Sequence, residues 1–157
     1  MVVHHGFNLT FELQGSSPEA RALFDLLTER DTLARIARFK DELGLGRERM
    51  FVAVGDGHDE DRFGGWTSSP LSRAHRLDIY AGPMGDDVEV RALYTLAHEL
   101  MHAFLYAHGF GMVHALVPAE VEGAAKDTLA FVDQLIARAE ESLTTQLTEL
   151  LWKRLLP

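Results

Sequence analysis

Residues 86–108 constrain this chain more than any other segment, because they predict one long helix with two histidines at helical spacing. Asp86 and Glu89 stand three residues apart and resemble a capping box at a helix start. Gly109 favours the end of a helix. At 1.5 Å per residue, a helix of about 22 residues is roughly 33 Å long.

The second half of this predicted helix carries a metal-binding pattern. His98 and His102 lie four residues apart, so their imidazoles stand about one turn from each other on the same face. Both rings can therefore reach one metal ion. Glu99 follows the first histidine and is close enough to act on a water bound to that metal. Together these residues form the HExxH pattern of zinc metallopeptidases, and they do so in the helical context that the pattern requires.

The composition predicts a folded chain that does not bind nucleic acid. Hydrophobic residues make up 46% and charged residues 25% of the 157 residues, as in an ordinary globular domain. The 24 acidic residues outnumber the 15 basic ones, and the formal net charge is -9. Binding to phosphates needs clustered Lys and Arg, so nucleic acid is not an expected partner.

Cysteine usage and hydropathy bear on the metal ligands and on location. The chain has no cysteine, so a metal must be held by histidine and carboxylate. No 18 apolar residues run together, and the start MVVHHGFNLTF lacks the basic and apolar regions of a signal peptide. We therefore expect a cytoplasmic protein without a membrane partner.

Strand and helix patterns precede the central helix. Residues 7–13 alternate between apolar and polar, which predicts a strand with one buried face. Ser17 and Pro18 predict the start of a helix that runs to Gly44, with a break at 28–31. Three further strands are predicted at 50–54, 66–68 and 76–81.

A second long helix is predicted over residues 119–155. Its apolar stripe comprises Val121, Ala125, Leu129, Val132, Ile136, Ala139 and Leu143. Such a helix can pack over the domain, break near 142–145 or pair with a second copy. The sequence leaves these three outcomes open, so a homodimer through this C-terminal helix stays among them.

The metal pattern lacks one ligand, because a catalytic zinc takes three protein ligands and leaves a fourth position to water. His108 would need the chain to turn at Leu105, where the predicted helix continues. His114 lies in a Gly-flanked loop and can swing in. Glu120 and Glu122 begin the next helix, whose antiparallel return would bring them beside the histidine pair.

The segment TLAHELMHAFL followed by AEVEGAAKD resembles the minimal zincins of the gluzincin type. It is similar in layout to the ImmA/IrrE-type metallopeptidases, with SprT-type proteins as a second relative, over roughly residues 64–131. The third ligand of gluzincins is a Glu that is commonly followed by Ala three residues later. Glu122 with Ala125 has this form, whereas Glu120 is followed by Gly123, so the resemblance favours Glu122.

The resemblance implies an α+β, zincin-like fold. An N-terminal helix and a small, mostly antiparallel sheet would pack on the HExxH helix, and a long C-terminal helical segment would follow. We expect one metallopeptidase domain over residues 1–157, with a core at about 7–131 and a C-terminal helical extension at about 132–157. The strand at 66–68 would be the edge that holds a peptide substrate by strand addition.

The implied activity is zinc-dependent endopeptidase hydrolysis of a peptide or protein. His98, His102 and Glu122 would bind Zn²⁺, and Glu99 would be the general base. The residue that stabilises the oxyanion is left open among Tyr94, Tyr106, His108, His114 and His75. The alternative is a zincin-fold binding or regulatory module with little or no proteolytic activity, which acts through a protein partner.

Overall fold

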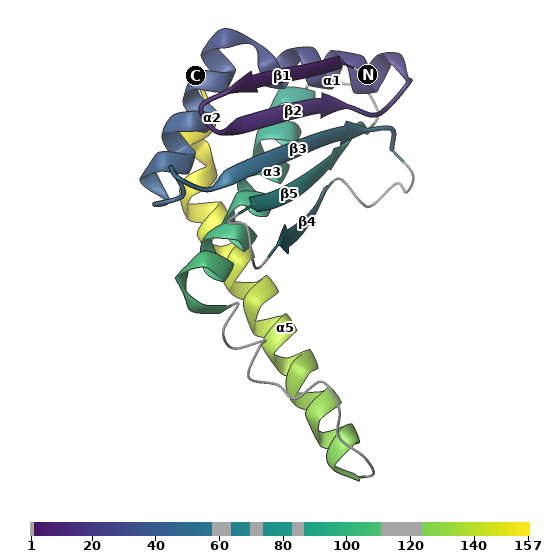
Figure 1. The fold of residues 1–157 in the computed structure, drawn as a ribbon, viewed down its shortest axis with the longest axis vertical. Coiled ribbons are helices and arrows are strands. Elements are labelled where there is room, and N and C mark those ends of the chain that lie inside the picture. The colour runs from purple at the N-terminus through teal and green to yellow at the C-terminus, as the bar shows by residue number, and fades with distance from the viewer. Residues whose placement is uncertain (1, 58–63, 70–73, 83–86, 111–123) are drawn as a thin grey trace.

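The computed structural model describes residues 2–57, 64–69, 74–82, 87–110 and 124–157, and these form a sheet with a layer of helices on one side (Figure 1). The elements in chain order are β1 Val2–Gly6, β2 Leu9–Leu13, α1 Pro18–Thr28, α2 Arg30–Glu42, β3 Arg49–Gly55, β4 Gly64–Ser69, β5 Ala74–Tyr80, α3 Val88–Leu105, the π-type turn η1 Tyr106–Phe110, α5 Ala124–Leu151 and the 3-10 turn η2 Trp152–Leu155. The predicted α+β class is confirmed.

The sheet has the strand order β1-β2-β3-β5-β4. β3 pairs in parallel with both β2 and β5, whereas β1–β2 and β4–β5 are antiparallel. The sheet is thus mixed, and the expectation of a mostly antiparallel sheet was wrong. Parallel pairing needs a long crossover, which α1 and α2 supply between β2 and β3. Alternation within a strand does not reveal the direction of its partner.

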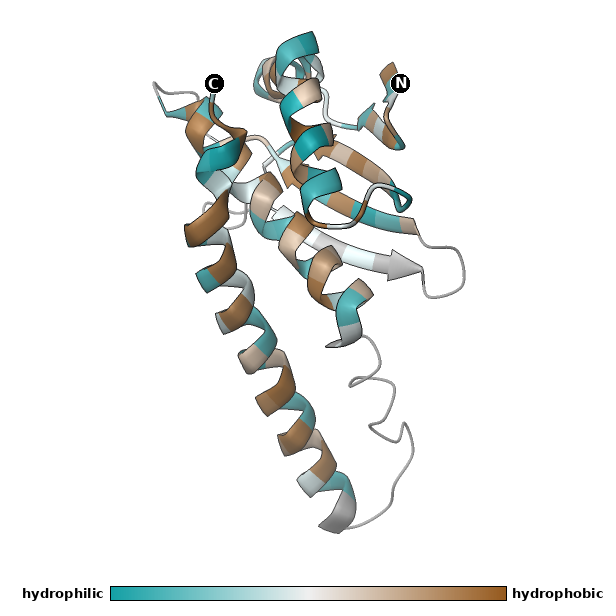
Figure 2. Ribbon diagram, turned by 90° about the vertical axis from the view of Figure 1, so that its left-hand side faces the viewer, coloured by the Kyte–Doolittle hydropathy of each residue, from teal (hydrophilic) through white to brown (hydrophobic). Residues whose placement is uncertain are grey.

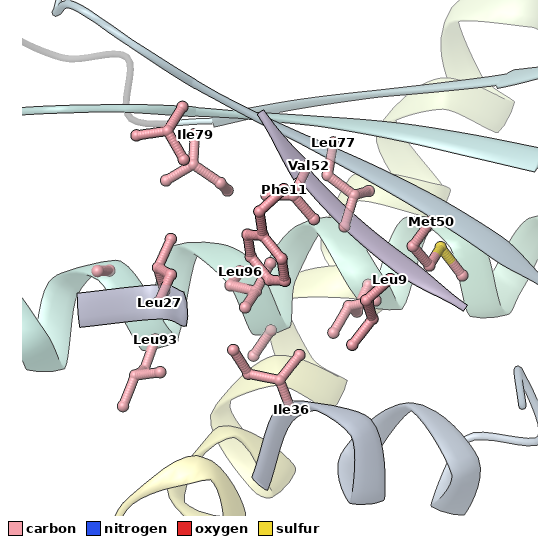
Figure 3. Packing of buried hydrophobic residues seen from close by; sticks show 14 of the residues in the cluster. Leu9, Phe11, Leu27, Ile36, Met50, Val52, Leu77, Ile79, Leu93 and Leu96 are labelled. Carbon is pink, nitrogen blue, oxygen red and sulfur yellow. The ribbon is translucent and has the colours of Figure 1, made fainter. Parts of the chain in front are cut away.

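The hydrophobic core lies between the sheet and the helices α1, α2 and α3 (Figure 3). The strands bury every second side chain against the helices, as the period of two requires. The buried residues labelled in Figure 3 are Leu9, Phe11, Met50, Val52, Leu77 and Ile79 from the strands and Leu27, Ile36, Leu93 and Leu96 from the helices. On the opposite face of the sheet Phe51 and Arg76 are exposed.

The N-terminal strand pattern hides a hairpin. Phe7 and Asn8 have φ angles of 54° and 58°, which two-residue hairpin turns require and which Asn tolerates better than Phe. β2 therefore begins at Leu9, after the turn, and β1 precedes it. The predicted strand at 7–13 is confirmed for its last five residues, Leu9–Leu13.

The predicted starts and stops around α1 and α2 are confirmed. The Ser17 hydroxyl oxygen accepts a hydrogen bond from the Ala20 N–H at 3.1 Å. Glu29, with a ψ of 139°, separates α1 from α2, and Gly44 follows α2 with a φ of 73°. Asp56 also fastens this end of α1, and hydrogen bonds from Ser17 and Ser16 lower its pKa to about 2.

The central helix α3 runs from Val88 to Leu105. Its N-cap residue is Asp87, whose side chain makes no capping hydrogen bond, and Asp86 lies outside the described residues. At its other end the regular helix stops at Leu105, three residues before the predicted end at 108. The chain leaves it through η1, where Gly109 has a φ of 129°.

Helix α5 returns antiparallel to α3 and is continuous past residues 142–145, where a break was one of the alternatives (Figure 1). Its C-terminal part packs on the body, where Thr144, Thr148 and the following Leu155 are fully buried. Its first part projects from the body, and Figure 2 shows hydrophobic residues recurring along it. Within the described part of the chain, no helix is long and apolar enough to cross a membrane.

Candidate metal centre

The centre is built on the side of α3 that faces α5. Tyr94, His98, His102 and Tyr106 follow one another at intervals of four residues, so they form one row along the helix. The rings of His98 and His102 have centroids 5.0 Å apart and are nearly perpendicular, at 83°. Both side chains are partly buried. The expected juxtaposition of the two histidines is therefore present.

Glu141 of α5 closes the centre from the opposite helix. Its Oε1 lies 3.1 Å from His98 Nε2, and its Oε2 lies 3.2 Å from His102 Nε2. Among the described residues, these three side chains form the group of potential metal ligands, with ligand atoms all within 4.8 Å of one another. The Glu141 side chain is 57% exposed, so the centre opens to solvent on the α5 side.

The two nitrogen-to-oxygen separations are compatible with a tetrahedral zinc site. Zinc binds histidine nitrogen and carboxylate oxygen at about 2.0–2.2 Å, which places two tetrahedral ligands about 3.4 Å apart. The two nitrogen-to-oxygen distances of 3.1 and 3.2 Å are close to this value. Two histidines and one glutamate are also a known ligand set of catalytic zinc, in which the fourth position is left to water or substrate.

Contacts with Glu140 and Thr144 orient the His102 ring. Its Nδ1 lies 3.5 Å from both Glu140 Oε1 and Thr144 Oγ1. The Thr144 hydroxyl donates a hydrogen bond to the Glu140 carbonyl oxygen at 2.8 Å. Towards His102 Nδ1 the Thr144 oxygen can therefore act only as an acceptor. Two acceptors facing Nδ1 favour a proton on this nitrogen. The Nε2 lone pair is then directed at the metal position, as in other carboxylate–histidine pairs beside metals.

The electrostatics of His98 also suit a ligand. Burial lowers the pKa of its ring, and the neighbouring His102 acts in the same direction, while the Glu141 carboxylate raises it. Burial is the largest of these effects. The His98 ring is therefore neutral near pH 7, and the neutral imidazole is the form that binds a metal.

Glu99 lies beside the ligands but on another side of α3. One residue along a helix is a rotation of about 100°, which turns Glu99 away from α5. It is only 6% exposed and lies against Thr95 and the first residue of β4, Gly64. No buried side-chain oxygen or nitrogen in the described ranges lacks a hydrogen-bond partner. Glu99 is thus buried towards β4, whereas the two histidines face α5.

Three of the four candidate third ligands, Glu122, Glu120 and His114, fall outside the described residues, so Glu122 stays a prediction. The fourth, His108, lies in η1 with its Nδ1 2.9 Å from the Phe104 carbonyl oxygen, and it is not part of the group formed by His98, His102 and Glu141.

Sequence reasoning missed Glu141, because it placed the antiparallel return at the start of the next helix. From Ala124 to Glu141, α5 rises about 26 Å before it meets the histidines. The available signal was the polar cluster Glu140, Glu141, Thr144 and Thr148, which lies beside the apolar stripe.

Among the residues considered for oxyanion stabilisation, Tyr94, His75 and Tyr106 have different surroundings. The Tyr94 hydroxyl donates to Glu149 Oε1 at 2.9 Å, and burial followed by this hydrogen bond raises its pKa. His75 is buried 3.4 Å from Glu48, and its ring contacts that of Tyr106 edge to face. Tyr106 is the member that continues the histidine row by one turn.

Comparison with known proteins does not add to this description. The chain matches no protein-family model, no curated protein and no solved structure. The site is thus defined by two histidine rings, one carboxylate that faces both, the Glu140 carboxylate beside His102 and a buried Glu99.

Proposed function

We propose that this chain is a zinc-dependent metallopeptidase in which His98, His102 and Glu141 bind the ion and Glu99 is the general base. The proposal depends on one observation. The two carboxylate oxygens of Glu141 lie 3.1 and 3.2 Å from the Nε2 atoms of the two HExxH histidines. This convergence supports Glu141 as the third ligand that the motif needs.

The zincin-like arrangement belongs to the same proposal. It is supported by an HExxH helix packed under a sheet, a neighbouring edge strand, β4, and a carboxylate-bearing helix that returns beside the histidines. In this arrangement β4 holds an extended peptide by strand addition, a mode open to an exposed edge. We also keep a cytoplasmic location as part of the proposal, since the chain has no cysteine.

The residues divide the reaction between them. Bound zinc supplies a Lewis acid that polarises the scissile carbonyl and lowers the pKa of its water towards about 7. Glu99 accepts the proton of the attacking water and then delivers it to the leaving nitrogen. Glu140 and Thr144 hold His102 in its ligand orientation. The burial of Glu99 limits competing water around the proposed base.

The test is the Glu99→Gln variant, which keeps the side-chain shape and removes the basic group. We expect zinc to stay near one per chain, by elemental analysis of dialysed protein. Cleavage of a quenched-fluorescent peptide mixture is expected to fall about 10²- to 10⁴-fold. The matched control is Glu89→Gln, since Glu89 lies on the same helix and faces Arg35 at 3.8 Å. A Glu99→Gln variant as fast as wild type would show that Glu99 is not the base.

A second candidate function is a binding module, which the projecting part of α5 favours. Phe131 is 59% exposed and Leu135 is 47% exposed, and Val132 lies beside them. Such an apolar surface suits a protein partner, and a second copy of this chain is one such partner. Under this reading, His98→Ala leaves partner binding unchanged. Loss of a dimer in a Leu135→Glu variant, measured by analytical ultracentrifugation, would assign the surface to self-association.

A further inference from the structure

The first residue of β4 approaches the general base more closely than any residue with a side chain could. A Cβ atom added to Gly64 would lie 2.6 Å from Glu99 Oε1 and 3.2 Å from its Cδ. It would also lie 2.7 Å from Thr95 Cγ2. Carbon contacts under 3.0 Å do not occur without movement of a neighbour, so the backbone of Gly64 packs directly on the carboxylate.

The direction of that movement follows from the neighbours. Thr95 is β-branched and buried on α3, so its methyl group has little freedom. Gly64 pairs with Ile79 at the antiparallel edge of the sheet, which fixes its backbone. The Glu99 carboxylate is the end of a longer side chain with three rotatable bonds. An added methyl group at position 64 would therefore displace the carboxylate first.

We propose that Gly64 is a positioning residue for catalysis, because its missing side chain lets β4 hold the Glu99 carboxylate in the orientation that the reaction needs. The inference rests on the proposed function of Glu99 as general base. It assigns a second role to β4, whose edge otherwise serves the substrate. Gly64 acts through Glu99, the neighbour that its missing side chain admits.

The first experiment measures the contact without metal or substrate. In the chelator-treated protein, Gly64→Ala is expected to lower the thermal unfolding midpoint by about 2–12 °C, as overpacking does. In a Glu99→Ala background the contact with the carboxylate is absent and only the contact with Thr95 Cγ2 remains, so the same substitution should lower the midpoint by clearly less. An equal loss in both backgrounds would overturn the proposed contact with the carboxylate.

The second experiment measures catalysis on the best-cleaved peptide of a quenched-fluorescent mixture. Gly64→Ala is expected to lower kcat about 10²-fold, the effect of misplacing a reacting group by about 1 Å, with KM and bound zinc unchanged. The double variant Gly64→Ala/Thr95→Ser removes the contact with the Thr95 methyl group and should recover part of the lost stability, while kcat stays low because the contact with the Glu99 carboxylate remains. Recovery of both together would assign Gly64 a purely structural role.

Two further variants separate the failure of this inference from the failure of the proposed function. Gly65→Ala is the matched control, since alternation along β4 turns position 65 to the other face of the sheet. It should keep kcat within about twofold of wild type, the range of ordinary surface substitutions. If Glu99→Gln is inactive while Gly64→Ala is fully active, only the positioning role fails. If Glu99→Gln is fully active, the proposed function fails.

Discussion

Two sides of helix α3 make different kinds of contact with the rest of the protein. The side that faces the sheet and the first two helices is apolar, and Leu93, Leu96 and Leu100 on it are fully buried. The side that faces α5 carries His98 and His102, which meet Glu140, Glu141 and Thr144. One side supplies a tightly packed hydrophobic contact, and the other supplies polar atoms that converge on one point.

The difference shows how one helix can serve both stability and chemistry. Apolar burial is non-directional, so the sheet side needs apolar side chains that fill the space and does not need particular polar atoms. Buried polar groups cost free energy unless each finds a partner, so the α5 side needs particular atoms in particular places. In the described part of the chain each buried polar side-chain atom has such a partner. Substitutions on the two sides should therefore have separable effects.

The largest expected effect comes from the apolar side. Leu96→Ala removes a fully buried side chain that points towards Phe11 (Figure 3) and should lower the free energy of unfolding by about 2–5 kcal/mol. Urea unfolding of the metal-free protein measures this. The control Leu150→Ala changes a side chain that is 75% exposed and should stay within about 0.5 kcal/mol. Similar losses for both variants would contradict the assignment of Leu96 to a tightly packed side of α3.

The next largest effect is a loss of zinc affinity, expected on the side of α3 that faces α5. Loss of a ligand's hydrogen-bond partner costs about 10- to 100-fold in metal affinity, so Glu141→Ala should weaken zinc binding by more than about 100-fold. Competition with a chromophoric chelator measures the dissociation constant. Because Glu141 is half exposed, the unfolding midpoint of the metal-free protein should barely change.

Glu122→Ala is the comparison variant for Glu141→Ala, since sequence reasoning favours Glu122 as the third ligand. We expect it to keep zinc affinity within about threefold of wild type, because the two histidines face Glu141 in the structure. If Glu122→Ala loses zinc and Glu141→Ala keeps it, the third ligand is Glu122 and the contact between α3 and Glu141 is only a surface ion pair.

A smaller loss of zinc affinity is expected when Glu140, which faces the ligand His102, is changed. Glu140→Gln removes the negative charge beside His102 Nδ1 and should weaken zinc binding about 10- to 100-fold, as loss of a second-layer carboxylate does. The same chelator competition measures it. Thr144→Ser keeps the hydroxyl that faces Nδ1 and should bind zinc like wild type. Unchanged affinity in Glu140→Gln would show that Glu140 does not orient the ligand.

Much of the fold could be predicted because it depends on local signals. Ser17 and Pro18 start α1, the segment around Glu29 divides α1 from α2, and Gly44 ends α2, each as expected from backbone chemistry. The turn at Phe7 and Asn8 could not be predicted, because a phenylalanine with positive φ is held by the pairing of β1 with β2 and not by its own preference.

The sequence by itself determined the parts of the site that lie on one element. The spacing of His98, Glu99 and His102 on a helix places two imidazoles on one face and a carboxylate beside them, because helix geometry is fixed. Only the tertiary structure decided what meets them. The length of α5 before it reaches α3 brings Glu141 to the histidines, and the sheet pairing brings Gly64 to Glu99. Contacts between elements depend on where each element begins and how it packs, and no local spacing encodes either.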